Sequence, residues 1–270
     1  MAIEYNAIVV QKQILNPDLA ILRISPVGWQ LPAFTPGQFA VVGLPGSAAR
    51  VQLADPEDPP PAPQKFIRRA YSIASSSKDQ EYLELYVALV RSGELTPRLF
   101  QLEPGAQIHL GPKITGMFTL ETVPASAHLV FIATGTGIAP YMSMLRSEVL
   151  AHPERHVAVL HGARHSWDLG YRAELTTLAR HVPSFAYVPA VSRPQQELAE
   201  WRGEVGHVQQ LWQRGVLGKA WGFEPTAADT HVFLCGNPAM VEDAMKVLGA
   251  QGFIEHTRSQ PGQIHVEKYW

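Results

Sequence analysis

A strand-like segment, Arg69-Ala70-Tyr71-Ser72, carries three side chains that could together hold a nucleotide cofactor. Alternate residues of a strand face the same side, so Arg69 and Tyr71 would project side by side while Ser72 faces across. A guanidinium can hold a phosphate through two hydrogen bonds, an aromatic ring can stack on an isoalloxazine, and a hydroxyl can reach a ring nitrogen. The segment therefore suits a flavin; the alternative is an amphipathic strand with an exposed arginine and a half-buried tyrosine.

A second candidate phosphate site follows in the turn Gly93-Glu94-Leu95-Thr96. Gly93 permits a tight turn, and the Thr96 hydroxyl, with backbone amides such as that of Leu95, could bind phosphate where a helix begins. A plain helix N-cap is the alternative. The position of the turn behind the arginine–tyrosine strand makes it a candidate for the same cofactor.

Two glycine turns, each between an apolar strand and a helix, favour dinucleotide binding. The first is Thr134-Gly135-Thr136-Gly137 and the second is Cys235-Gly236-Asn237. Glycines let a backbone approach a pyrophosphate, and a helix N-terminus offers it unpaired amides. Strand ends of a parallel sheet meet at one edge, so Cys235 would face the same crevice as Gly135 and Thr136. The alternative for Cys235 is a small buried residue.

The elements around these motifs predict two domains. Short strands separated by turns favour an antiparallel β-barrel or sandwich, and are expected over residues 7–10, 19–24, 39–44, 70–74, 82–90 and 107–110. After Pro124 a pattern of strand, glycine turn and helix recurs, which indicates an α/β parallel sheet. Its strands are expected over 128–133, 157–161, 186–191 and 231–234, and its helices over 141–150, 171–179, 208–214 and 238–248. We place a barrel domain at 1–125 and a nucleotide-binding domain at 126–270.

Composition narrows the classes of function. The chain has 270 residues, enough for two cores, and a formal charge of -2, which favours neither nucleic acid nor a membrane surface as partner. Its single cysteine cannot build a disulfide within the chain or a four-cysteine cluster, and no metal site is expected. The absence of a signal sequence and of a long apolar stretch predicts a cytoplasmic protein, and a monomer is favoured.

The motifs, in their order and spacing, resemble the ferredoxin (flavodoxin)–NADP+ reductases, within the ferredoxin-reductase-like flavoproteins. The resemblance covers nearly the whole chain and is carried by residues 34–39, 69–72, 93–99, 116–120, 135–140, 235–240 and 267–270. It implies an FAD-binding N-terminal barrel and an NADP(H)-binding C-terminal α/β domain. It also implies hydride exchange with NADP(H) and single-electron exchange with ferredoxin or flavodoxin.

The resemblance implies roles for individual residues. Arg69 would bind FAD phosphate, Tyr71 would stack on the flavin, and Ser72 would lie beside flavin N5. Cys235 and Glu267 would lie near the nicotinamide. Tyr269 would cover the flavin face where the nicotinamide stacks, but the chain ends one residue later than the plant-type members, so Trp270 could take that place instead. The alternative is an ordinary frayed terminus.

The choice of NADPH over NADH depends on groups that bind the 2′-phosphate, since a phosphate requires arginines and hydroxyls. Loops after the second and third expected parallel strands supply the candidates, which are Arg164, Ser192, Arg193 and Arg202. We expect the three arginines to converge on one site. The alternatives are an NADH-dependent reductase of the cytochrome or oxygenase type, or a non-catalytic FAD-binding electron-transfer subunit. Basic residues near the flavin motifs are candidates to meet an acidic partner, and they are Arg68, Arg91, Arg98 and Lys113.

Overall fold

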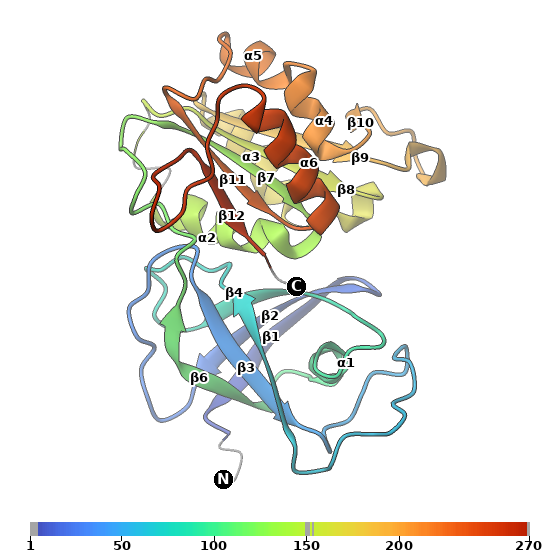
Figure 1. Cartoon of the computed structure of the whole chain (residues 1–270). Coiled ribbons are helices and arrows are strands. Elements are labelled where there is room, and N and C mark those ends of the chain that lie inside the picture. The colour runs from blue at the N-terminus through green and yellow to red at the C-terminus, as the bar shows by residue number, and fades with distance from the viewer. Residues whose placement is uncertain (1–4, 149–151, 153, 269–270) are drawn as a thin grey trace. The chain divides into compact units, whose positions relative to one another are not determined.

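The computed structural model describes residues 5–148, 152 and 154–268, which fold into two compact units (Figure 1). The first unit runs to Thr119 and also takes in helix α2 (Ala139–Ser147). The second comprises Leu120–Ile138 and the chain from Glu148 onward. Helix α2 thus packs with the first unit although it follows a strand of the second. The division into domains at residues 125 and 126 stays a prediction.

The first unit is a six-stranded antiparallel sheet that closes on itself. Its strands are β1 (Ala7–Asn16), β2 (Leu19–Pro26), β3 (Phe39–Pro45), β4 (Phe66–Ser72), β5 (Leu83–Ala88) and β6 (Gln107–Thr115), in the order β4-β3-β6-β1-β2-β5. The two end strands are joined by an antiparallel bridge between Ile73 and Leu85. The short helix α1 (Thr96–Gln101) follows β5. The expected barrel is confirmed.

Burial along the barrel strands separates its core from its exposed edge. β5 is buried over Leu83–Val87, including the charged residue Glu84. Strand β4 differs, because Arg68, Arg69 and Ala70 are all exposed on it. β4 ends the strand order and meets β5 only through the bridge beyond its last residue. The middle of β4 therefore offers an open strand edge to a ligand.

The second unit is a six-stranded parallel sheet with helices on both faces. Its strands are β7 (His128–Thr134), β8 (Val157–Ala163), β9 (Phe185–Val191), β10 (Glu204–Val205), β11 (Thr230–Cys235) and β12 (Ile264–Glu267), in the order β10-β9-β8-β7-β11-β12. Its helices are α3 (Arg172–His181), α4 (Val208–Gln213), α5 (Val216–Trp221) and α6 (Pro238–Gly249), with short 3-10 turns at η1 (Gly135–Ile138), η3 (Ser166–Asp168) and η4 (Pro194–Gln196).

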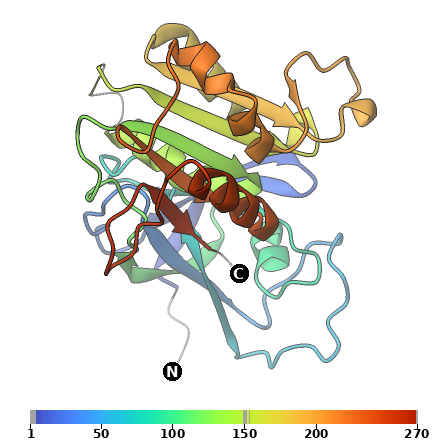
Figure 2. The same cartoon turned by 45° about the horizontal axis from the view of Figure 1, so that its top comes forward.

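One face of this sheet carries α4, α5 and α6. Val130, Ile132, Leu160 and Leu234 form a core with these helices, and α6 crosses that face in both views (Figures 1 and 2). Successive side chains of a strand face opposite sides of the sheet, so His161, next to Leu160, faces the other side, as does Tyr187. On that side α3 packs along β9. The predicted α/β parallel sheet is confirmed.

The structure also contains elements that the sequence pattern did not predict. β4 begins at Phe66, four residues before the expected strand, and α5 and β12 were not predicted as elements, whereas α1 begins at Thr96, where the sequence places a helix start. β12 pairs with β11 in parallel, with Glu267 opposite Cys235. Within the described residues, no helix is both long and apolar enough to cross a bilayer, and no group of three or more metal-ligating side chains occurs.

Candidate functional site

The open edge of β4 presents the predicted flavin-binding residues. Arg69 is exposed, whereas Tyr71 is half-buried, with part of its side chain packed against the barrel core. Burial raises the pKa of the Tyr71 phenol well above its usual value, so the ring is neutral. Ser72, the next residue, is buried. A cation and a partly open aromatic ring therefore lie on one strand, as the sequence predicts.

The predicted phosphate turn lies beside this strand. The carboxylate of Glu94 pairs with Lys65 and, at 3.4 Å, with Arg69, and the hydrogen bond from Lys65 is the main cause that lowers the pKa of Glu94. The Thr96 hydroxyl accepts a hydrogen bond from the amide of Val90 at 2.9 Å. It closes the turn and does not cap α1, whose N-cap is the buried residue Leu95. The alternative of a plain helix N-cap at Thr96 is therefore wrong, and its phosphate-binding role stays a prediction.

Arg98, which the sequence places among the candidates for partner contact, is buried next to the phosphate turn. The side chain of Arg98 is only 2% exposed, and its guanidinium donates to both carboxylate oxygens of Glu57, at 2.7 and 2.9 Å. It also donates to the carbonyls of Glu94 and Gly46, each at 2.6 Å. Arg98 thus connects the loop between Gly46 and Glu57 with the phosphate turn. Because Arg98 is buried, the hypothesis that it contacts a partner protein is wrong.

The two glycine turns of the second unit interlock. The amide of Asn237 donates to the Thr134 hydroxyl at 2.8 Å, and Asn237 in turn caps α6. A Cβ atom on Gly137 would meet the carbonyl of Cys235 and lie 2.8 Å from the amide nitrogen of Gly236, too close for a side chain. Glycine at 137 is therefore required by the close approach of the two strand ends.

The backbone of the first glycine turn is accessible at Gly135. Gly135 has a φ of 55° and nothing within 4 Å of a Cβ built on it, and Thr136 is half-buried. An open glycine turn at the ends of two parallel strands gives a pyrophosphate room to approach backbone amides. This turn therefore fits a dinucleotide, and it can do so through its backbone amides alone, without a contribution from a side chain.

Cys235 and Glu267, which the resemblance places near the nicotinamide, lie side by side. Cys235 is fully buried, its sulfur is 3.9 Å from the Glu267 carboxylate, and the two residues are paired across β11 and β12. The predicted roles of Tyr269 and Trp270 lie outside the described residues.

The candidate 2′-phosphate residues fall into two places. Arg164 and Arg193 are joined through a backbone hydrogen bond of 3.0 Å, and Ser192 donates its amide to Ala163 just before them. Arg202 instead lines a cavity beside α3 and pairs with Glu200 at 3.2 Å. Neither Arg164 nor Arg193 contributes to that cavity.

Two family models match the chain, one on each unit. Residues 58–117 match the oxidoreductase FAD-binding domain, and residues 131–246 match the oxidoreductase NAD-binding domain. The first match contains β4 and the phosphate turn, and the second contains both glycine turns. The fold and these matches define an FAD- and NAD-binding oxidoreductase.

Relatives narrow this class further. A flavodoxin/ferredoxin–NADP reductase of Buchnera aphidicola is 33% identical over 208 residues, covering 76% of this chain and 82% of the relative. One from Escherichia coli is 31% identical over 238 residues, with 88% of each chain covered. A ferredoxin NADP+ reductase from Neisseria gonorrhoeae, with bound FAD and NADP, superimposes with a TM-score of 0.79 at 27% identity over 98% of both chains. The chain belongs to the flavodoxin/ferredoxin–NADP reductase family.

Proposed function

We propose that this oxidoreductase exchanges a hydride with NADP(H) and single electrons with ferredoxin or flavodoxin. The observation that carries the proposal is the presence, in one chain, of an open flavin-type strand edge on β4 and an interlocked pair of glycine turns at β7 and β11. Relatives with this arrangement are named for NADP, flavodoxin and ferredoxin. When bound, FAD supplies the chemistry that links a two-electron donor to one-electron acceptors.

The chain's residues have positioning roles in this proposal. Arg69 binds a phosphate of FAD, with Gly93, Leu95 and Thr96 shaping the turn beside it. The neutral ring of Tyr71 stacks on the flavin, and the exposed backbone at Ala70 lets the cofactor lie along the strand edge. Ser72 is placed by the strand to reach a ring nitrogen.

On the nucleotide side, backbone amides of the glycine turns bind the pyrophosphate. The segment from Thr134 to Gly137 and the turn at Gly236 provide these amides. Buried Cys235 and half-buried Glu267 together orient the nicotinamide and keep water away from it.

Anaerobic mixing with NADPH tests the proposed reaction. Purified holoenzyme should lose its yellow flavin absorbance when NADPH is added, and added oxidised flavodoxin or ferredoxin should restore it. A flavin that stays yellow would eliminate the enzymatic function and favour an electron-transfer subunit. Bleaching without reoxidation by either protein would remove the proposed partners only.

Arg69 and Glu94 should affect FAD binding in opposite directions. Arg69→Ala removes a charged phosphate ligand and is expected to weaken FAD binding by about 10- to 100-fold. Glu94→Gln removes a carboxylate that competes with phosphate for Arg69, and should strengthen binding by up to about fivefold, since the exposed pair is weak. Fluorescence titration of apoprotein with FAD measures both. Weaker binding by Glu94→Gln would mean that its pairing with Lys65 is needed to hold the turn.

Arg164 and Arg193 should determine the preference for NADPH. Each change to alanine is expected to lower kcat/KM for NADPH by about 10- to 100-fold while NADH is little affected, because only NADPH carries the 2′-phosphate. Arg202→Ala should have a smaller effect, since the Arg202 side chain is 85% exposed and already pairs with Glu200. A wild-type preference for NADH would instead support the reductases of the cytochrome or oxygenase type.

The C-terminal residues give a further prediction. Deleting Tyr269 and Trp270 should change KM for the nicotinamide nucleotide or the retention of FAD, because an aromatic ring on the flavin face competes with the nicotinamide. Steady-state kinetics and the flavin-to-protein absorbance ratio measure these effects. Unchanged values for both would remove the proposed role of the tail.

Partner docking is proposed on basic residues close to β4. Arg68 and Lys113 are exposed and suit an acidic protein, whereas Arg91 already pairs with Asp18. Removing both free charges should raise KM for flavodoxin or ferredoxin without changing the anaerobic reaction with NADPH. The monomeric state and the cytoplasmic location stay predictions.

A further inference from the structure

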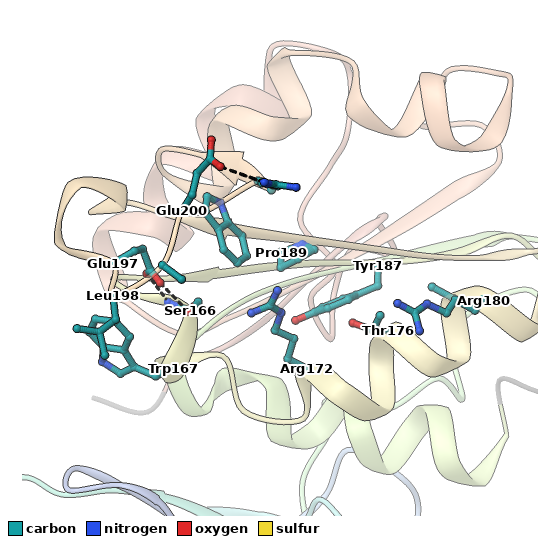
Figure 3. Close-up of a pocket in the computed structure, with 15 residues that line it drawn as sticks. Ser166, Trp167, Arg172, Thr176, Arg180, Tyr187, Pro189, Glu197, Leu198 and Glu200 are labelled. Atoms are coloured by element: carbon teal, nitrogen blue, oxygen red, sulfur yellow. Dashed lines mark hydrogen bonds and ion pairs between the residues drawn. The ribbon is translucent and has the colours of Figure 1, made fainter.

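A cavity of about 810 Å³ lies within the second unit, on the face of the parallel sheet that carries α3 (Figure 3). Its walls are α3, strand β9, the 3-10 turn η3 and the segment 197–203. Neither glycine turn contributes a residue to its lining. Of its lining, the function proposed above uses only Arg202, and the volume of the cavity falls in the range of sites for small organic ligands.

The α3 wall of the cavity is cationic. Arg172, Thr176 and Arg180 recur every four residues along the helix and so lie on one side of it. Within the described part of the chain, neither guanidinium has a carboxylate partner, and Arg172 lies 4.8 Å from the centre of the Trp201 ring. Two positive charges without counter-charges in a hollow attract an anion.

The acidic side chains on the opposite wall are already paired. Glu197 accepts hydrogen bonds from the amide and hydroxyl of Ser166, at 2.7 and 2.6 Å. Glu200 pairs with Arg202 at 3.2 Å. Neither acid forms an ion pair with the α3 arginines: Arg202 offsets the charge of Glu200, and the hydrogen bonds from Ser166 hold Glu197 in the segment that closes the cavity. Three arginines therefore face two carboxylates in the lining.

Aromatic rings form the rest of the lining and are held in place. The Trp201 indole donates to the carbonyl of Glu204 at 2.8 Å. The Tyr187 hydroxyl lies 3.2 Å from Nδ1 of His161, whose ring is fully buried and whose pKa burial lowers to about 3, so the imidazole is neutral. Figure 3 shows Tyr187 on β9, between Arg172 and Arg180 of the facing helix. The cavity is thus preformed.

We propose that this cavity binds a phosphate-bearing aromatic compound of mononucleotide size, at a site separate from the glycine turns. Guanidinium groups bind phosphate through paired hydrogen bonds, and the ring of Tyr187 can accept a flat ring beside Trp201, one face of which is covered by Arg172. The two arginine Cα atoms are about 12 Å apart, at 1.5 Å per helical residue, which matches the length of a nucleotide more closely than that of inorganic phosphate. An uncharged ring would leave both arginines without a partner.

Calorimetric titration of the holoenzyme with FMN tests the proposal, with saturating NADP+ present so that the nicotinamide nucleotide site is filled. Bound FAD already fills the flavin site. We expect one FMN per chain, with riboflavin and inorganic phosphate each binding at least about tenfold more weakly, since each lacks one half of the recognised chemistry. Loss of FMN binding as NADP+ is raised would overturn the proposal, because the cavity would then belong to the dinucleotide site.

Variants locate the binding. Arg172→Leu with Arg180→Leu should weaken FMN binding at least about tenfold, and Trp201→Leu should also weaken it, while FAD content and NADPH oxidation stay unchanged. Lys246→Leu is the matched control, because it removes an exposed cation from α6, on the other face of the sheet. Equal binding of FMN and riboflavin, or unchanged FMN binding by the double variant, would exclude this cavity as the site.

Discussion

Replacing Glu57 with alanine is expected to lower the free energy of unfolding by about 3–5 kcal/mol, because it leaves the buried guanidinium of Arg98 without its counter-charge. The hydrogen bond from Arg98 lowers the pKa of Glu57, so the carboxylate is ionised at neutral pH. The remaining bonds of Arg98 to the carbonyls of Glu94 and Gly46 do not neutralise it. Thermal denaturation should show a melting temperature lower by about 10 °C.

Two comparisons separate this effect from ordinary loss of an ion pair. Glu103→Ala breaks the pair with Lys12, but Glu103 is 73% exposed, so a change within about 1 kcal/mol is expected. Replacing Arg98 with methionine and Glu57 with leucine together should recover part of the stability, because the buried charge of Arg98 is removed with its partner, while Arg50 still loses the Glu57 carboxylate 3.6 Å away. If Glu57→Ala is as mild as Glu103→Ala, the buried pair is not a determinant of barrel stability.

The sequence predicts the fold well where local patterns determine it. The change from alternating strands to strand–turn–helix units near Pro124 identifies both sheets, because side-chain periodicity follows directly from which face is buried. The flavin-type strand and both glycine turns were found for the same reason, since each depends on residues adjacent in the chain. The family resemblance placed Cys235 and Glu267 near the nicotinamide, which stays a prediction; their contact with each other is found only in the structure.

Contacts between distant charges could not be predicted. Arg98 and Glu57 are far apart in sequence, and so are buried Glu84 and its partners Arg23 and Arg146, at 2.8 and 2.7 Å. A charged residue carries no local sign that it will be buried, because its partner is set by the fold. The cavity beside α3 was not predicted because its walls also come from distant parts of the chain. Strand β12 was not predicted because four residues are too few for a periodic signal.

Gly137→Ala is expected to reduce kcat/KM for NADPH by about 100-fold, because it forces the two glycine turns apart at the point where a pyrophosphate would bind. The new methyl group would meet the Cys235 backbone, which cannot move as a flexible side chain could. The shift would carry Cys235 away from Glu267 and disturb the bond between Thr134 and Asn237. Stopped-flow reduction at several NADPH concentrations measures the loss of binding and of hydride transfer separately.

The control for this change must show that alanine itself is harmless. Gly249→Ala lies at the end of α6 with nothing within 4 Å of the added atom, so it should leave activity unchanged and stabilise the helix by up to about 1 kcal/mol. FAD content must also stay at the wild-type level in Gly137→Ala, because the flavin residues lie in the other unit. A Gly137→Ala enzyme that keeps its FAD and reacts with NADPH within twofold of wild type would show that the strand ends can separate at little cost. Loss of FAD together with NADPH activity would point to general unfolding, whereas loss of NADPH activity alone would assign the glycine to the nucleotide site.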